Sequence, residues 1–320
     1  MWQLISRSLL AAGLAFAVSM AMAPALIRAL KRLKVGQVVR DDGPKSHLAK
    51  SGTPTMGGVM IIVAAILSAA LVSTGFEHLS IALFVTTACG VIGMVDDYLS
   101  IVAHRSLGLR ARHKLVLQLL VGLVLGGYAF IDPHMGTSLA IPFTTFRIEL
   151  GVWYIPFAAF TLMAMTNAVN LTDGLDGLAA GCVAVTCFAY VLVSAVAGDW
   201  EAGAFAGAVG GACIGFVWWN SHPAAVIMGD SGSLALGAAL AGLAVMTKTE
   251  LTLALMSGVY VAEALSVTIQ VLHYKRTKRR VFRMAPLHHH FELGGMAEPK
   301  LVVRFWIAAA FFAALGLAGL

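Results

Sequence analysis

The sequence Asn-Ala-Val-Asn-Leu-Thr-Asp-Gly-Leu-Asp-Gly-Leu occupies residues 167–178 and separates two long apolar runs. Its polar residues recur every three positions, at Asn167, Asn170, Asp173 and Asp176. Neighbouring members of such a series lie close together on a helix, but steps of three drift around it, so the four side chains cannot share one narrow face. The two glycines lower helix propensity and allow close backbone approach. The stretch therefore predicts a helix that ends in a tight polar loop, with side chains converging on a ligand.

The composition is typical of a membrane protein. Hydrophobic residues make up 59% of the 320 residues and charged residues only 12%, with a mean hydropathy of +0.85. Repeated apolar runs near the length of a bilayer span predict an all-α, polytopic membrane protein rather than a soluble one. We expect a single transmembrane domain over residues 1–320. The four cysteines lie in apolar runs without metal-ligand or disulfide spacing, so we interpret them as small buried hydrophobes.

Ten apolar runs are candidate transmembrane helices. A helix needs about 20 residues to cross the hydrocarbon core, and several of these runs are shorter. The runs cover residues 8–30, 57–75, 79–95, 115–131, 152–168, 178–197, 202–219, 231–247, 251–274 and 301–319. The segment 132–150, between the fourth and fifth runs, is expected to form a small hairpin or a surface helix.

The basic residues predict the orientation in the membrane. Of the 22 Lys and Arg residues, all but Arg7, Arg147 and Lys248 fall in or beside the loops that follow odd-numbered runs. By the positive-inside rule these loops face the cytoplasm and both termini lie outside. Membrane topology and an anionic substrate account for the net charge of +6, so we expect no nucleic-acid partner.

Five aspartates gather at the cytoplasmic ends of the expected spans. Asp96 and Asp97 follow the third run, Asp173 and Asp176 follow the fifth, and Asp230 precedes the eighth. Ionisable groups at membrane depth are expensive, so they need partners or a function. Any one of them could be a solvated helix end, and Asp230 could cap the eighth helix. Five on one side favour a functional site, whose oxygen ligands suit Mg²⁺ or Mn²⁺ better than Zn²⁺.

Two further clusters carry cationic or imidazole side chains. Lys50 precedes a Gly- and Thr-rich turn that could hold phosphate, although it is not a Walker A sequence and could be an ordinary basic loop. The triplet His288–His290 follows several arginines; adjacent histidines cannot all face one ion, so the triplet suits a diphosphate better than zinc. With the aspartates, these clusters predict a cytoplasm-facing cleft for phosphoryl transfer between a soluble nucleotide and a membrane-embedded phosphate acceptor.

Motifs spread over nearly the whole chain match one family. They are Gly36–Pro44, Lys50–Gly58, Asp96-Asp97, Asn167–Leu178, Met228–Leu234, Met284–Glu292 and Val303–Trp306. Through them the chain resembles the phospho-N-acetylmuramoyl-pentapeptide transferases of the polyprenyl-phosphate N-acetylhexosamine-1-phosphate transferase superfamily. The resemblance implies a ten-helix fold in the bacterial inner membrane and Mg²⁺ dependence. It implies transfer of phospho-MurNAc-pentapeptide from UDP-MurNAc-pentapeptide to undecaprenyl phosphate, giving lipid I and UMP, with a homodimer as a candidate assembly.

The resemblance also implies roles for individual residues. Asp230 looks like a Mg²⁺ ligand, with Asp173 as a second one. Asp96 looks like the base that deprotonates the lipid phosphate, with Asp97 beside it as a further catalytic residue. The residues that resemble those around the nucleotide, diphosphate or sugar are Lys50, Thr55, Asn167, Asn170, Asp176, Asn220, His288, His289 and His290. Both direct attack and a covalent aspartyl intermediate stay open.

Two positions depart from the pattern of that family. Ser100 stands three residues after the aspartate pair, where the family usually has Lys, so one cation is missing from the expected phosphate site. Lys114 and Arg105 are candidate replacements. Ile227 stands three residues before Asp230, where the family usually has an aromatic residue that can stack on uracil. Its absence should weaken nucleotide binding by roughly 1–3 kcal/mol.

Three other functions stay open. A related transferase could move N-acetylhexosamine-1-phosphate to the same lipid, although the sequence Pro286–Glu292 argues against it. A transporter is disfavoured because the aspartates gather at one membrane face rather than at the midplane. The main acidic residue inside a span, Glu263, is interpreted as a helix–helix hydrogen-bond partner. A catalytically silent scaffold is the third alternative, motivated by Ser100 and Ile227.

Overall fold

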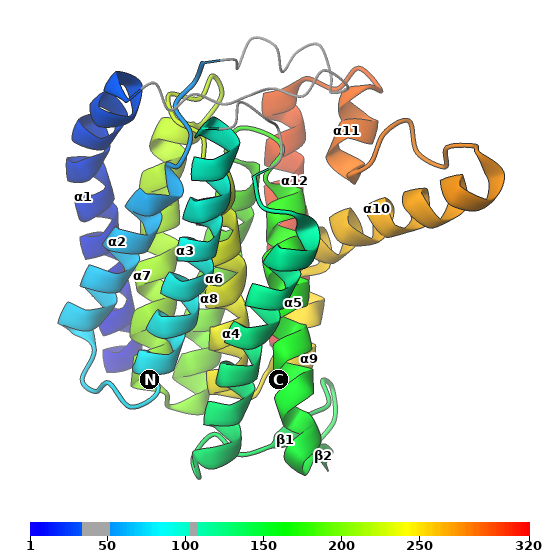
Figure 1. Cartoon of the computed structure of the whole chain (residues 1–320). Helices are drawn as coiled ribbons and strands as arrows, with labels where there is room; N and C mark the ends of the chain where they lie inside the picture. Colours follow the sequence, from blue (N-terminus) through cyan, green and yellow to red (C-terminus); the bar gives the residue numbers. More distant parts are fainter. Residues whose placement is uncertain (34–51, 103–107) are drawn as a thin grey trace.

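The computed structural model describes residues 1–33, 52–102 and 108–320, and these residues are mainly helical (Figure 1). The all-α class expected from the sequence is therefore confirmed. Lys50 and Arg105 lie outside the described residues. The elements are α1 (Trp2–Arg32), α2 (Gly58–Val72), α3 (Leu79–Val102), α4 (Ala111–Ile131), β1 (Ser138–Ala140), β2 (Arg147–Glu149), η2 (Gly151–Trp153), α5 (Tyr154–Thr172), α6 (Leu178–Ala197), α7 (Trp200–Asn220), α8 (Gly229–Thr247), α9 (Glu250–Met256), α10 (Gly258–Thr277), α11 (Leu287–Glu292) and α12 (Glu298–Ala318).

Helix α8 forms the centre of the bundle. All its residues from Ser231 to Met246 are buried, and it packs against α3 on one side and α5 on another. Helix α1 packs along α7, and α6 contacts both α7 and α12. A Cβ atom on Gly207 or Gly211 of α7 would collide with the backbone of α1. Small residues thus let these helices approach closely, as is common for helices in lipid.

The ten expected spans correspond to helical segments, but two differ from straight, full-length spans. Among the described residues, eight helices are long and apolar enough to cross a membrane. Helix α2 has 15 residues, which corresponds to about 22 Å, less than a hydrocarbon core of about 30 Å. The ninth expected span, 251–274, is divided into α9 and α10, which meet at an angle of 80°.

The expected span 251–274 is therefore helical but broken at Ser257 and Gly258. Gly258, the first residue of α10, lies so close to Phe312 of α12 that a Cβ atom would collide with the ring. Glycine also disfavours a helix interior by about 1 kcal/mol relative to alanine. Beyond this break, α10 points away from the bundle (Figure 1), and its polar residues contact the segment that contains α11. Oε1 of Glu263 accepts the backbone N–H of His288, and Nε2 of Gln270 donates to the carbonyl oxygen of Phe282.

The two ends of the bundle differ in character. Both chain termini and the β1–β2 hairpin lie at one end (Figure 1). The strands pair antiparallel, with Ser138 opposite Glu149, which confirms a hairpin within 132–150. We call the opposite end the polar end; it is where α3, α5 and α7 end, where α8 begins and where α11 lies. Termini on the same side agree with the topology predicted from the basic residues.

Candidate active site

The polar turn between α5 and α6 has the predicted form. Asn170 lies in the last turn of α5, and Asp173 is the C-cap residue, with its N–H donating to the carbonyl oxygen of Val169 over 3.1 Å. Gly177 precedes α6 with φ of 79°, in the left-handed region that glycine enters without steric cost. The helix end and the tight loop are therefore confirmed.

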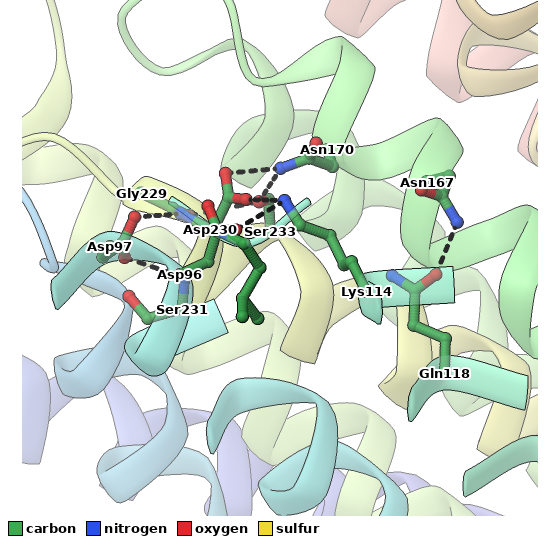
Figure 2. Close-up of polar contacts among 11 residues, drawn as sticks. Asp96, Asp97, Lys114, Gln118, Asn167, Asn170, Gly229, Asp230, Ser231 and Ser233 are labelled. Carbon is green, nitrogen blue, oxygen red and sulfur yellow. Dashed lines mark hydrogen bonds and ion pairs between the residues drawn. The ribbon is translucent and has the colours of Figure 1, made fainter. Parts of the chain in front are cut away.

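Three aspartates and one lysine meet at the polar end (Figure 2). We call Asp96, Asp97, Asp230 and Lys114 the carboxylate cluster. The Nζ atom of Lys114 forms an ion pair with Asp230 and lies 3.3 Å from Oδ1 of Asp96. The amide of Asn170 donates to Oδ1 of Asp230 over 2.8 Å. Residues from α3, α4, α5 and α8, far apart in the sequence, thus converge around one carboxylate.

Asp97 holds the beginning of α8. Its Oδ1 accepts the backbone N–H of Asp230 over 3.0 Å, and its Oδ2 accepts that of Ser231, also over 3.0 Å. The first N–H groups of a helix have no partner within the helix, and a negative charge beside them is favourable. This geometry makes Asp97 a positioning residue for Asp230.

The aspartate pair lies inside α3 rather than after it. The sequence predicts that the third span ends near residue 95, but α3 continues to Val102, because the residues after Asp97 are mostly apolar and include neither Gly nor Pro, which would end a helix. Asp96 is 8% exposed. Its Oδ1 accepts the N–H of Leu109, just before α4, over 2.8 Å. Asp96 therefore faces the cluster and also ties the start of α4 to α3.

The segment around Thr55 supports the loop that leads into α8. The N–H of Ile227 donates to the carbonyl oxygen of Pro54 over 2.7 Å. Gly229 has φ of 76°, and a Cβ atom there would lie 2.6 Å from Oδ2 of Asp97 and 2.9 Å from Oγ1 of Thr55. Thr55 is buried, and its Oγ1 lies beside Gly229, next to the carboxylate cluster.

A second cluster lies beside the polar turn. One ligand atom each from Asp176, His222 and Glu298 lie within 4.8 Å of one another. Oδ2 of Asp176 is 3.1 Å from Nδ1 of His222, and the N–H of Asp176 donates to Oε1 of Glu298 over 2.8 Å. The sequence predicts a site role for Asp176 but not for His222 or Glu298, since no local pattern shows that the loop after α7 and the start of α12 meet this turn.

Two predicted substrate-binding asparagines form internal contacts. Asn220 is buried; its Oδ1 accepts the N–H of Gly177 and its Nδ2 donates to the carbonyl oxygen of Val226, both over 2.8 Å. Asn167 donates to Oε1 of Gln118 in α4 over 2.8 Å (Figure 2). Asn220 therefore joins two loops, and Asn167 joins two helices. Their substrate contacts stay predictions.

His288 is the member of the histidine triplet that contacts the polar turn. Its ring is buried, and its Nδ1 lies 3.2 Å from Oε1 of Glu263. The backbone N–H of His288 donates to the same oxygen over 3.1 Å. The ring packs directly on Gly174. Glu263 is thus a partner between packed helices, as interpreted from the sequence.

His289 and His290 contact different partners from His288. Nδ1 of His289 lies 3.1 Å from Oε2 of Glu292, and Nδ1 of His290 accepts the backbone N–H of Arg283 over 3.1 Å. The three rings therefore do not face one ion, as expected for consecutive residues of a helix. Their contact with a diphosphate stays a prediction.

The carboxylate cluster fits a hard divalent cation. Its candidate ligands are the carboxylates of Asp96 and Asp230, and such oxygen donors are those that Mg²⁺ prefers. Both oxygens of Asp97 accept backbone N–H groups of α8, and the catalytic role expected for Asp97 stays a prediction. Asp173 lies three residues beyond Asn170, at the end of α5, and its role as a second ligand stays a prediction.

Comparisons with known proteins give matches over most of the chain. Residues 78–248 match glycosyl transferase family 4, and residues 50–62 match the phospho-N-acetylmuramoyl-pentapeptide-transferase signature 1. The phospho-N-acetylmuramoyl-pentapeptide-transferase of Moorella thermoacetica is 49% identical over 305 residues, 95% of this chain and 96% of the relative. The enzyme of that name from Desulfitobacterium hafniense is 46% identical over 330 residues, 99% and 98% of the two chains.

A third relative of the same name, from Bacillus velezensis, is 45% identical over 306 residues, 94% of each chain. Similarity at this level over nearly the whole length removes the support for a transporter. With the family match covering more than half of the residues, the chain belongs to the phospho-N-acetylmuramoyl-pentapeptide-transferase family of membrane-embedded glycosyl transferases.

Proposed function

We propose that this protein transfers phospho-MurNAc-pentapeptide from UDP-MurNAc-pentapeptide to undecaprenyl phosphate, with Mg²⁺ as cofactor, and so produces lipid I and UMP. The observation that carries the proposal is the carboxylate cluster at the polar end, where Asp96 and Asp230 flank the ammonium of Lys114. Joining two anionic phosphates requires cations that neutralise their charge and carboxylates that hold those cations. The names of the full-length relatives support the choice of substrates.

We assign a different role to each aspartate of the carboxylate cluster. Asp230 and Asp96 would hold Mg²⁺, which would neutralise the diphosphate and the charge that develops on the leaving UMP. Asp96 also accepts the proton of the lipid phosphate. In the overall reaction, an oxygen of that phosphate forms a bond to the sugar-linked phosphorus, and the bond between this phosphorus and UMP breaks with its electron pair leaving on UMP. Asp97 keeps Asp230 in place through the first turn of α8.

The polar end is proposed to face the cytoplasm of the bacterial inner membrane. Helix α1 ends and α4 begins at this end, next to segments that the positive-inside rule assigns to the cytoplasm, and both termini lie at the other end. Cysteine substitutions next to β1 should therefore react with a membrane-impermeant maleimide in intact cells, whereas substitutions next to α11 should not. A homodimer is the proposed assembly, which light scattering of the detergent-solubilised protein tests.

The function is tested by UMP release from purified protein. UDP-MurNAc-pentapeptide and undecaprenyl phosphate are supplied with Mg²⁺ or with EDTA, and Asp230→Asn is compared with the wild type. Asp132→Asn, at the opposite end, serves as the matched control and should keep its activity. Mg²⁺-dependent release that Asp230→Asn loses supports the proposal. Activity of Asp230→Asn would contradict the ligand role of Asp230, and a preference for UDP-GlcNAc would instead indicate the related sugar-1-phosphate transferase.

A further inference from the structure

Lys114 occupies the centre of the carboxylate cluster. Its Nζ lies between Asp96 and Asp230, 3.3 Å from the first and ion-paired with the second (Figure 2). Among the described residues, it is the one basic side chain that forms ion pairs with the aspartates of the cluster. Its side chain is 18% exposed, so it is partly shielded from water.

Both oxygens of Asp230 are already engaged in this arrangement. Oδ2 contacts Lys114, and Oδ1 accepts the amide of Asn170 over 2.8 Å. A divalent cation held by Asp96 and Asp230 would use the same carboxylate oxygens that the ammonium now contacts. Two cations at contact distance also repel each other strongly where water is scarce. The cation and the ammonium would therefore compete for these oxygens.

Lys114 is well suited to leave its place. Lysine carries a compact charge on a flexible stem of four carbons, and the charge can swing without the backbone moving. Ser100 lies in the last turn of α3, four residues after Asp96 on the same helix, and brings no cation to this end of the site. An ammonium released from Asp230 can pair with an incoming phosphate.

From these contacts we infer that Lys114 is a positioning residue that occupies the divalent-cation site in the substrate-free protein, and that the bound cation displaces it. The inference rests on the proposed function only in that a cation binds at Asp230. Until then, Lys114 balances the charge of the carboxylates and keeps them close together. A permanent structural ion pair, the alternative, would leave the ammonium on Asp230 whether or not a metal is bound.

The first test measures Mn²⁺ binding, by electron paramagnetic resonance of free Mn²⁺, to the full-length protein in detergent without substrates. Lys114→Met keeps the length of the stem and removes the charge. It should bind Mn²⁺ about tenfold more tightly or better than the wild type, since the competing cation is gone. Lys248→Met is the matched control, because Lys248 is similarly shielded, pairs with Glu250 over 3.5 Å and lies at the other end. It should bind Mn²⁺ as the wild type does.

Unchanged or weaker Mn²⁺ binding by Lys114→Met would overturn the inference. Asp230→Asn introduced into Lys114→Met should abolish the gain, and a gain that survives this second change would place the metal elsewhere and also overturn it. Neither measurement uses turnover. A protein that shows the gain but releases no UMP therefore contradicts the proposed function and leaves the inference standing.

A second test avoids substitution altogether, since Lys114→Met leaves Asp96 and Asp230 without their cation and could fail to fold. The wild-type protein is acetylated with and without Mg²⁺, and the modification of each lysine is followed by mass spectrometry. Displacement predicts that Mg²⁺ accelerates acetylation of Lys114 and leaves that of Lys248 unchanged. Equal or slower acetylation of Lys114 in Mg²⁺ would show that the ion pair persists, and would overturn the inference.

Discussion

The imidazole ring of His288 fills the space that a Cβ atom on Gly174 would need. Nδ1 of the same ring lies 3.2 Å from Oε1 of Glu263. A chain of contacts therefore runs from α10, which leaves the bundle, through α11 to the polar turn. Residues more than 100 positions apart in the sequence set the position of the turn that carries Asp173 and Asp176.

We expect Gly174→Ala to disturb this turn. The added methyl group must push away either the ring of His288 or the turn itself, and overpacking of this kind costs about 1–3 kcal/mol. Both the melting temperature in detergent and the rate of UMP release should fall. Gly127→Ala in α4 is the control, because nothing lies within 4 Å of a Cβ atom at that position. A Gly174→Ala protein with the stability and rate of the wild type would contradict the described packing.

Glu263→Gln should change the electrostatic surroundings of the His288 ring while keeping the shape of the site. The amide fills the same volume but removes the charge that faces Nδ1 and that accepts the backbone N–H of His288, and a hydrogen bond to a charged group contributes about 1.5–3 kcal/mol. We expect kcat for UMP release to fall about tenfold or more, and the ¹⁵N signal of one histidine to shift in protein labelled at its histidines. Glu250→Gln, another buried glutamate, lies at the opposite end and should leave that signal in place. An unshifted spectrum for Glu263→Gln would refute the pairing.

The adjacent aspartates of α3 should respond differently to the same substitution. Asp97→Asn weakens two bonds to the first turn of α8 and removes a favourable charge there, so we expect it to lose roughly 1–3 kcal/mol of stability. Asp96→Asn should cost less stability, because it removes one of three neighbouring carboxylates, yet it should abolish UMP release. Thermal unfolding in detergent, measured on both variants, checks that Asp97→Asn lowers the melting temperature more than Asp96→Asn does. The reverse order of stability would show that Asp97 does not hold α8.

Ile227→Phe should strengthen binding of the uridine donor. Ile227 is partly exposed, and an aromatic ring there could stack on uracil, which is worth roughly 1–3 kcal/mol. We expect KM for UDP-MurNAc-pentapeptide to fall on the order of tenfold, with little change in kcat. Ile227→Leu, which adds no ring, should leave KM unchanged. Equal values of KM for the two variants would mean that residue 227 does not contact the base.

The amino-acid sequence alone predicts the features that depend on short stretches of chain. Apolar runs locate the helices, the Asn- and Asp-containing stretch 167–178 locates the helix end and polar turn, and the segment 132–150 contains the expected hairpin. These features follow from hydrophobicity, helix propensity and glycine conformation, which act within a few residues. The family motifs also pointed to the aspartates that meet at the polar end.

The packing of the helices sets the features that join distant residues. Gly258 breaks the ninth span where it meets Phe312, Asp97 bonds to the start of α8, and Lys114 sits between Asp96 and Asp230. No local pattern distinguishes a lysine that ends in water from one that ends between two carboxylates. The distinction arises because α3, α4 and α8 are pressed together in a bundle, where a buried charge must find an opposite charge to be stable.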